Sequence, residues 1–141
     1  MTEPWFGSKK TLTLALARHL MSAAEREIGA RGWAMYVAIA DDSGTPVLVT
    51  AVNGPQLASY EISVSKARAA VHFRRPTKVW EERVRGGAPN VMSLRGVVAS
   101  EGGVPLVVDG QVIGAVGVSG GTGAEDGVVA AAVLDALQGL A

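Results

Sequence analysis

A glycine-rich loop near the C-terminus is the first segment whose residue types could do chemistry. Ser119-Gly120-Gly121-Thr122-Gly123 stands between an apolar segment and a segment with helical periodicity. The free N–H groups at the start of a helix bind carboxylates and phosphates, so this loop could hold an anionic ligand. It has neither the Gly-Lys-Ser/Thr ending of a P-loop nor the GxGxxG spacing of a dinucleotide site. The alternative is a tight strand-to-helix connection that uses glycine only for its backbone freedom.

A second group of candidates is cationic and lies on or just after one predicted helix. Its members are Lys66, His72, Arg74 and Arg75. They could form an anion-holding rim, in which His72 could donate or accept a hydrogen bond or ligate a metal. The alternative is that these cations complement the C-terminal end of the helix dipole and keep the protein soluble. The other histidine, His19, falls within an amphipathic helix, where we expect a structural role.

The third candidate is a carboxylate, Glu101, which directly precedes Gly102-Gly103 between two strand-like segments. It could act as a general acid or base or orient a ligand, or it could be a solvated turn residue. No second carboxylate stands at a spacing typical of glycosidases, and the GxSxG and HExxH motifs are absent. The sequence therefore contains no complete catalytic constellation, and whether the protein is an enzyme stays open.

The composition excludes several other classes of site. The chain has no cysteine, which rules out disulfides, zinc–thiolate sites and iron–sulfur clusters. It has 13 Lys and Arg residues against 13 Asp and Glu, so no global charge favours nucleic acid or an acidic membrane. The N-terminal residues lack the apolar core of a signal peptide, and no apolar run reaches the ~18 residues of a spanning helix. We expect a soluble, cytoplasmic protein without nucleic-acid or membrane partners.

The elements that must position these candidates are helices and paired strands. Apolar residues three and four positions apart predict a first helix from Thr11, with Gly29 and Gly32 as candidate stops. Further helices are predicted over about 59–73, over 78–85 and after residue 123, with a loop over 86–90. Strands are predicted over 33–40, 46–52, 104–108 and 112–118, and residues 97–100 could add one more before the last two.

The order of these elements favours an α+β fold, an antiparallel sheet flanked by helices. The strands come in hairpins, and Asp109-Gly110 is a favoured two-residue hairpin turn. Thr77 is expected to cap the helix over 78–85, and Glu125 and Asp126 are expected to complement the N-terminal dipole of the last helix. No strand–helix–strand crossover supports a parallel nucleotide-binding fold.

We expect one domain over residues 11–141, preceded by an irregular N-terminal arm over residues 1–10. Trp5 and Phe6 are unusual in a free tail. We therefore expect these two aromatic residues to pack against the domain or a neighbouring subunit.

Several segments form an ordered series along most of the chain. They are Leu12–Ala24, Ile39-Ala40-Asp41 with Gly44, Ser63-x-x-Lys66-Ala67-x-x-Ala70, Phe73-Arg74-Arg75-Pro76-Thr77, Glu101-Gly102-Gly103-x-Pro105-Leu106 and Gly114-Ala115-Val116-Gly117-Val118-Ser119-Gly120-Gly121. Together they resemble the GlcG/HbpS-like (DUF336, haem-degrading or haem-binding) family, which includes the C-terminal domain of PduO-type corrinoid proteins.

The resemblance implies a PAS- or profilin-like sheet, assembly into dimers or higher oligomers, and haem or corrinoid as the cofactor or ligand. His72 does not come from the resemblance, but an imidazole can ligate haem iron, and we expect no other metal site. The resemblance and this chemistry together give the expected ligand-binding residues: Asn53, Lys66, His72, Phe73, Arg74, Arg75, Thr77, Gly102, Gly103, Ser119, Gly120, Gly121 and Thr122.

One segment departs from the family pattern. Many relatives continue the second strand with Arg-Met-Asp-Gly-Ala, whereas this chain has Ala51-Val52-Asn53-Gly54-Pro55. The arginine could bind a carboxylate and the aspartate could serve as a base, so their loss suggests a different, more apolar ligand.

The leading hypothesis is a homo-oligomeric small-molecule-binding protein whose ligand is haem or another tetrapyrrole. The alternative is a metal-independent enzyme acting on a small organic acid or aromatic metabolite. In that enzyme Glu101 would be the acid/base, and Lys66 or the loop amides would hold the anion. A third hypothesis is a structural domain that serves only assembly.

Overall fold

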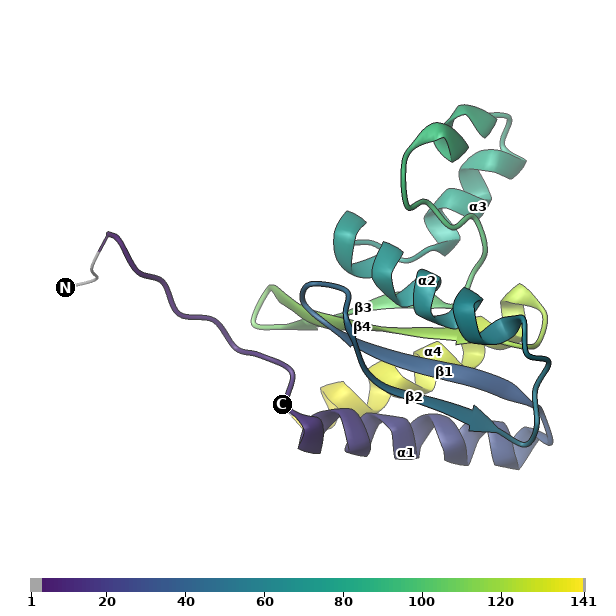
Figure 1. The fold of residues 1–141 in the computed structure, drawn as a ribbon, viewed down its shortest axis with the longest axis horizontal. Coiled ribbons are helices and arrows are strands. Elements are labelled where there is room, and N and C mark those ends of the chain that lie inside the picture. The colour runs from purple at the N-terminus through teal and green to yellow at the C-terminus, as the bar shows by residue number, and fades with distance from the viewer. Residues whose placement is uncertain (1–3, 141) are drawn as a thin grey trace.

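The computed structural model, which describes residues 4–140, is an antiparallel sheet with helices on both faces (Figure 1). Its four strands lie in the order β2-β1-β4-β3. The elements are α1 (Leu14–Arg31), β1 (Met35–Asp41), β2 (Pro46–Val52), α2 (Ser59–Phe73), α3 (Lys78–Arg85), the 3-10 helix η1 (Pro89–Ser93), β3 (Gly103–Val108), β4 (Gln111–Ser119) and α4 (Gly123–Gln138). The expected α+β class is confirmed.

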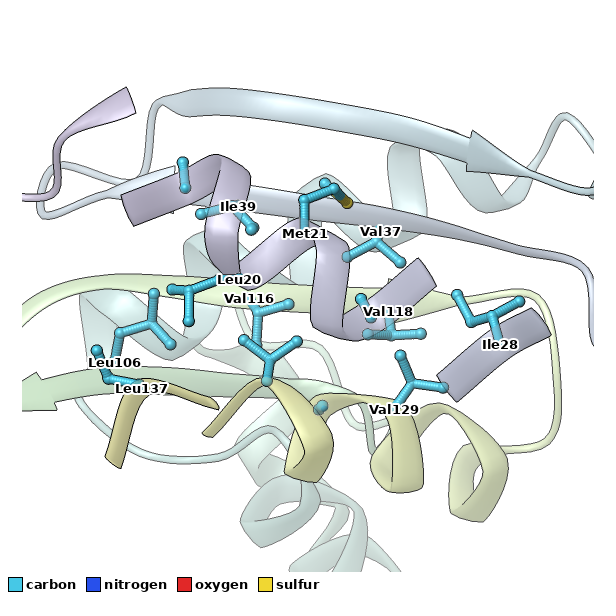
Figure 2. Packing of buried hydrophobic residues seen from close by; sticks show 14 of the residues in the cluster. Leu20, Met21, Ile28, Val37, Ile39, Leu106, Val116, Val118, Val129 and Leu137 are labelled. Carbon is cyan, nitrogen blue, oxygen red and sulfur yellow. The ribbon is translucent and has the colours of Figure 1, made fainter. Parts of the chain in front are cut away.

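Helices α1 and α4 cover one face of the sheet and pack against each other (Figure 1). Thr13 starts α1 by accepting a hydrogen bond from the N–H of Leu16 at 3.1 Å, and Gly32 ends it in the left-handed conformation. The predicted stop at Gly32 is therefore confirmed, whereas Gly29 lies inside the helix. Figure 2 shows the core of this layer, in which alternate side chains of β1 and β4 meet the apolar sides of both helices.

Helix α2 covers the other face and approaches the sheet unusually closely. The contact layer is built largely from Ala38, Ala40, Ala67, Ala70 and Ala115. In addition, a Cβ atom on Gly117 of β4 would lie 2.0 Å from the carbonyl oxygen of Ser63. Only glycine permits this approach, which sets the position of every candidate residue on α2.

Two tight turns complete the sheet as predicted. Asp109 and Gly110, between β3 and β4, both have positive φ, of 51° and 75°. In the β1–β2 turn the Asp41 carboxylate accepts hydrogen bonds from Ser43 and from the N–H of Thr45. The hydroxyl hydrogen bond from Ser43 is the main reason that the pKa of Asp41 lies below its ordinary value.

Three expectations about the segment between α2 and β3 need correction. Thr77 does not cap α3 with its side chain, because its Oγ1 accepts the N–H of Gly103 at 2.9 Å. Residues 97–100 form no strand, because the paired edge of the sheet begins only at Gly103. Part of the expected loop over 86–90 is instead the start of η1.

The expected N-terminal arm, where the structure describes it, runs outward from the rest of the chain without helix or strand (Figure 1). Residues 1–3 of that expected arm lie outside the described residues. Trp5 and Phe6 are 82% and 76% exposed, so they do not pack on their own chain. Ion pairs of Lys9 with Asp42 and of Lys10 with Asp109 hold the base of the arm against the two hairpin turns. No helix among residues 4–140 is long and apolar enough to cross a membrane.

Candidate functional site

The buried centre of the candidate region is an ion pair between Lys66 of α2 and Asp126 of α4. The Lys66 side chain is 1% exposed, and its Nζ donates to Asp126 Oδ2 at 2.9 Å and to the carbonyl of Val118 at 2.8 Å. The other carboxylate oxygen of Asp126 accepts the N–H of Gly121 at 3.0 Å. Burial raises the pKa of Asp126, and the Lys66 charge and these hydrogen bonds oppose that rise.

The glycine pair after Glu101 makes room for this lysine. Gly102 has φ of 133°, and a Cβ there would lie 2.9 Å from Lys66 Nζ. A Cβ on Gly103 would lie 2.4 Å from the Lys66 carbonyl oxygen. The structure therefore brings together four of the predicted ligand residues, Lys66, Gly102, Gly103 and Thr77. All four are buried in the interior of the protein and do not line an open pocket.

The N–H groups of the glycine-rich loop are bonded to the chain's own carboxylates. Gly121 donates to Asp126, and Thr122 donates to Glu125 Oε1 at 2.9 Å. Glu125 in turn donates its N–H to Thr122 Oγ1, which completes a capping box at the start of α4. In this arrangement the protein itself supplies the anions that the loop could otherwise take from a ligand.

Asn53 and Ser119 lie at the end of the sheet where β1 begins. Asn53 donates its side-chain amide to the carbonyl of Trp33 at 3.1 Å. Ser119 is buried at the end of β4 and pairs with Tyr36 of β1. Ala51 is the β2 partner of the same Tyr36.

His72 lies in the last turn of α2, beside the β1–β2 turn. Its Nε2 is 2.9 Å from the carbonyl oxygen of Ser43. A carbonyl can only accept, so Nε2 donates, and the neutral ring keeps a free lone pair on Nδ1.

His72 also lines a cavity of about 530 Å³ between the two hairpin turns and the base of the arm. The lining residues are Lys9, Lys10, Asp42, Val71, His72, Arg74, Gly110, Gln111 and Val112. The cavity therefore combines one imidazole with three cationic side chains and one carboxylate, and two of the cations, Lys9 and Lys10, are paired with Asp42 and Asp109. Its volume lies within the range of small-molecule sites.

Glu101 lines a different cavity, of about 340 Å³, beside the start of α4. Its carboxylate lies over α4, because a Cβ on Gly127 would be 2.0 Å from Glu101 Oε2. Glu81 accepts a hydrogen bond from the backbone N–H of Glu101 at 3.4 Å and lines the same cavity.

Among the described residues, no three His, Asp or Glu side chains gather closely enough to hold a metal ion.

Phe73 and Arg75 belong to a fifth place, around Trp80 of α3. Phe73 packs edge-on against the indole with ring centroids 5.0 Å apart, and the Arg75 guanidinium stacks on it. The predicted ligand residues are thus divided among the buried ion pair, the β1 end of the sheet, the His72 cavity, this aromatic cluster and the Glu101 cavity, which Thr122 lines.

Sequence reasoning missed the role of Asp126, although the sequence carries a signal for it. Asp126 falls three and seven positions before Val129 and Val133, on the apolar face of α4. A carboxylate on a buried face needs a cationic or hydrogen-bonding partner. Lys66, four positions before Ala70 on the buried face of α2, carries the matching signal.

These features belong to a known class of protein. The family model described as "Haem degrading protein HbpS-like" matches residues 12–135. The chain therefore belongs to the HbpS-like family, and the resemblance found in its sequence is confirmed.

Individual relatives agree in sequence and in fold. The Escherichia coli K12 protein GlcG is 39% identical over 112 residues, which are 79% of this chain and 84% of GlcG. The crystal structure of the Klebsiella pneumoniae protein ORFY, a DUF336 protein, is 28% identical, with 100% of both chains covered and a TM-score of 0.90. The PduOC:heme complex is 29% identical over 90% of this chain and 95% of that chain, with a TM-score of 0.82.

Proposed function

We propose that this chain is a small-molecule-binding protein whose ligand is haem or another tetrapyrrole, held in the cavity lined by His72. The observation that carries the proposal is the cavity itself, which places an imidazole among Lys9, Lys10 and Arg74. The structurally similar PduOC was crystallised with heme, which supports this ligand class.

The residues present fit the polar groups of haem. A metal-binding histidine characteristically donates its second ring N–H to a carboxylate or a backbone carbonyl. The hydrogen bond from His72 Nε2 to Ser43 has this pattern and leaves Nδ1 available for iron. Arg74 has no carboxylate partner within the described chain, so its guanidinium can bind one of the haem carboxylates.

Each residue then has a defined task. His72 would hold the iron, and the Ser43 carbonyl would keep the ring in the required tautomer. Arg74 would orient one carboxylate, while Lys9 and Lys10, which are paired with Asp42 and Asp109, would flank it. Val71 and Val112 would contact the apolar part. The bound haem would supply the redox and oxygen-binding chemistry of its iron.

The enzymatic alternative has weaker support from the geometry. Glu101 does line a cavity, as a catalytic carboxylate should. However, the two groups expected to hold the anionic substrate, Lys66 and the Gly121 N–H, are both bonded to Asp126. We therefore favour binding over catalysis by Glu101.

We also propose that the chain forms a homo-oligomer through its N-terminal arm. Trp5 and Phe6 are large aromatic residues on a segment that leaves its own domain (Figure 1). Covering such side chains with a second subunit removes apolar surface from water, which favours association.

Native mass spectrometry of the protein loaded with haemin tests both proposals together. We expect an oligomer that carries one haem for each subunit. The double variant Trp5→Ser/Phe6→Ser should dissociate to smaller species, whereas Leu140→Ser, which also removes an exposed apolar residue, should not. An unchanged oligomer in the arm variant would contradict the role of the arm, and absence of bound haem would contradict the ligand.

A further inference from the structure

The segment between α2 and β3 carries a large share of the positive charge of this neutral protein. Residues 74–98 contain six of the 13 Lys and Arg residues but only two of the 13 Asp and Glu residues. Two of these cations, Lys78 and Arg85, lie 3.9 Å from Glu82 and Glu81 respectively, as exposed pairs along α3. Helix α3 lies beyond α2, away from the sheet (Figure 1), so the charge is concentrated on one projecting part of the molecule.

Trp80 is the centre of this part. Its side chain is 3% exposed, and Phe73 packs edge-on against it. The guanidinium carbons of Arg75 and Arg83 lie 5.3 and 5.1 Å from the centroid of the Trp80 ring. Because both guanidinium groups lie over the same ring, the two charges are close to each other. Stacking on the ring also restrains the position of each guanidinium group.

Neither of these arginines has a carboxylate partner within the described part of the chain. Arg75 donates its Nε to the carbonyl of Phe73, which leaves its terminal N–H groups free. Two like charges held near one ring repel each other, and an anion between or beside them would relieve that repulsion.

The indole nitrogen of Trp80 provides a second, independent observation. Trp80 Nε1 is buried and has no hydrogen-bond partner among residues 4–140. An indole N–H can only donate, and a buried donor without an acceptor is uncommon and costs stability. A ligand group that reached this N–H would have to be an acceptor, as a carboxylate oxygen is.

We propose that Arg75, Trp80 and Arg83 form a binding site for a small dicarboxylate, separate from the cavity lined by His72. Each guanidinium binds one carboxylate through paired N–H groups. The Trp80 N–H is covered in this structure, so it donates to one of the same oxygens only when the side chains that cover it move aside. Two guanidinium groups placed around one ring match two separate anionic groups better than they match one compact anion. The site requires neither haem nor an oligomer.

The indole N–H itself reports on this site in ¹H–¹⁵N correlation spectra of the ¹⁵N-labelled protein. The chain has three tryptophans, and Trp80→Phe identifies the Trp80 signal by its loss. If that variant does not fold, Trp5→Phe and Trp33→Phe identify the same signal by elimination. On titration with succinate or glutarate we expect a saturable shift of the Trp80 N–H signal, with the Trp33 signal unmoved.

Variants and matched anions decide the outcome. Arg75→Gln and Arg83→Gln should each weaken succinate binding about tenfold or more, since each removes one charge-assisted contact. Arg26→Gln removes an exposed arginine from α1 and should change the affinity by less than about twofold. The proposal is overturned if the Trp80 signal does not respond to succinate, or if Arg75→Gln and Arg83→Gln both bind succinate as the wild type does. It is also overturned if acetate and inorganic phosphate bind as tightly as succinate.

Discussion

Replacing Gly117 with alanine is expected to destabilise the fold by about 3 kcal/mol or more. The new Cβ would lie 2.0 Å from the Ser63 carbonyl oxygen and 2.6 Å from the Ala67 nitrogen, both in the backbone of α2. A rotamer change cannot relieve this overlap, so the whole helix must move away from β4. Urea unfolding followed by circular dichroism measures the loss.

Gly29→Ala is the matched control for this prediction. Gly29 lies within α1 at negative φ, and a Cβ there meets no atom within 4 Å. Alanine is a better helix former than glycine, so we expect stabilisation by roughly 0.5–1 kcal/mol. If the two variants unfold at the same urea concentration, α2 does not approach β4 as closely as described.

Breaking the ion pair between Lys66 and Asp126 is the second large effect that we expect. Lys66→Met leaves the buried Asp126 carboxylate without its cation and the Val118 carbonyl without its donor. Removal of one partner of a buried pair typically costs about 3–5 kcal/mol. Urea unfolding at neutral pH should show a loss of this size.

A double-mutant cycle separates the charge from the packing. Lys66→Met/Asp126→Leu removes both charges, so it should be less destabilised than the sum of the two single variants. The loss will not vanish, because Gly121 also donates to Asp126. Lys78→Met, in an exposed pair with Glu82, should leave the unfolding midpoint almost unchanged. Strict additivity in the cycle would show that Lys66 and Asp126 are not coupled in solution.

The sequence predicted the elements where local chemistry determines them. Pro76 requires the residues before it to leave helical geometry, and α2 does end at Phe73. Asp109-Gly110 supplies two positive φ angles, and the β3–β4 hairpin turns there. Gly32 ends α1 for a similar reason.

The candidate site was less predictable because it depends on contacts between distant segments. Lys66 and Asp126 are 60 positions apart. The apolar periodicity of α2 and α4 places each of them on a buried face, but it does not show that they pair with each other. The glycine-rich loop could serve as an anion site or as a tight connection, and its sequence does not show that Asp126 and Glu125 bond the N–H groups of Gly121 and Thr122. Lys9 and Lys10 reach the His72 cavity only because the arm passes the two hairpin turns.

The central proposal is that haem binds in the cavity lined by His72, and absorbance titration with haemin tests it most directly. We expect the wild-type protein to shift the Soret band saturably, and His72→Ala to weaken binding by about tenfold or more and to alter the bound spectrum. The matched control is His19→Ala, which removes the other histidine, an exposed residue of α1. It should bind haemin as the wild type does. A wild-type protein that leaves the Soret band unshifted, or a His72→Ala variant indistinguishable from His19→Ala, would contradict the account.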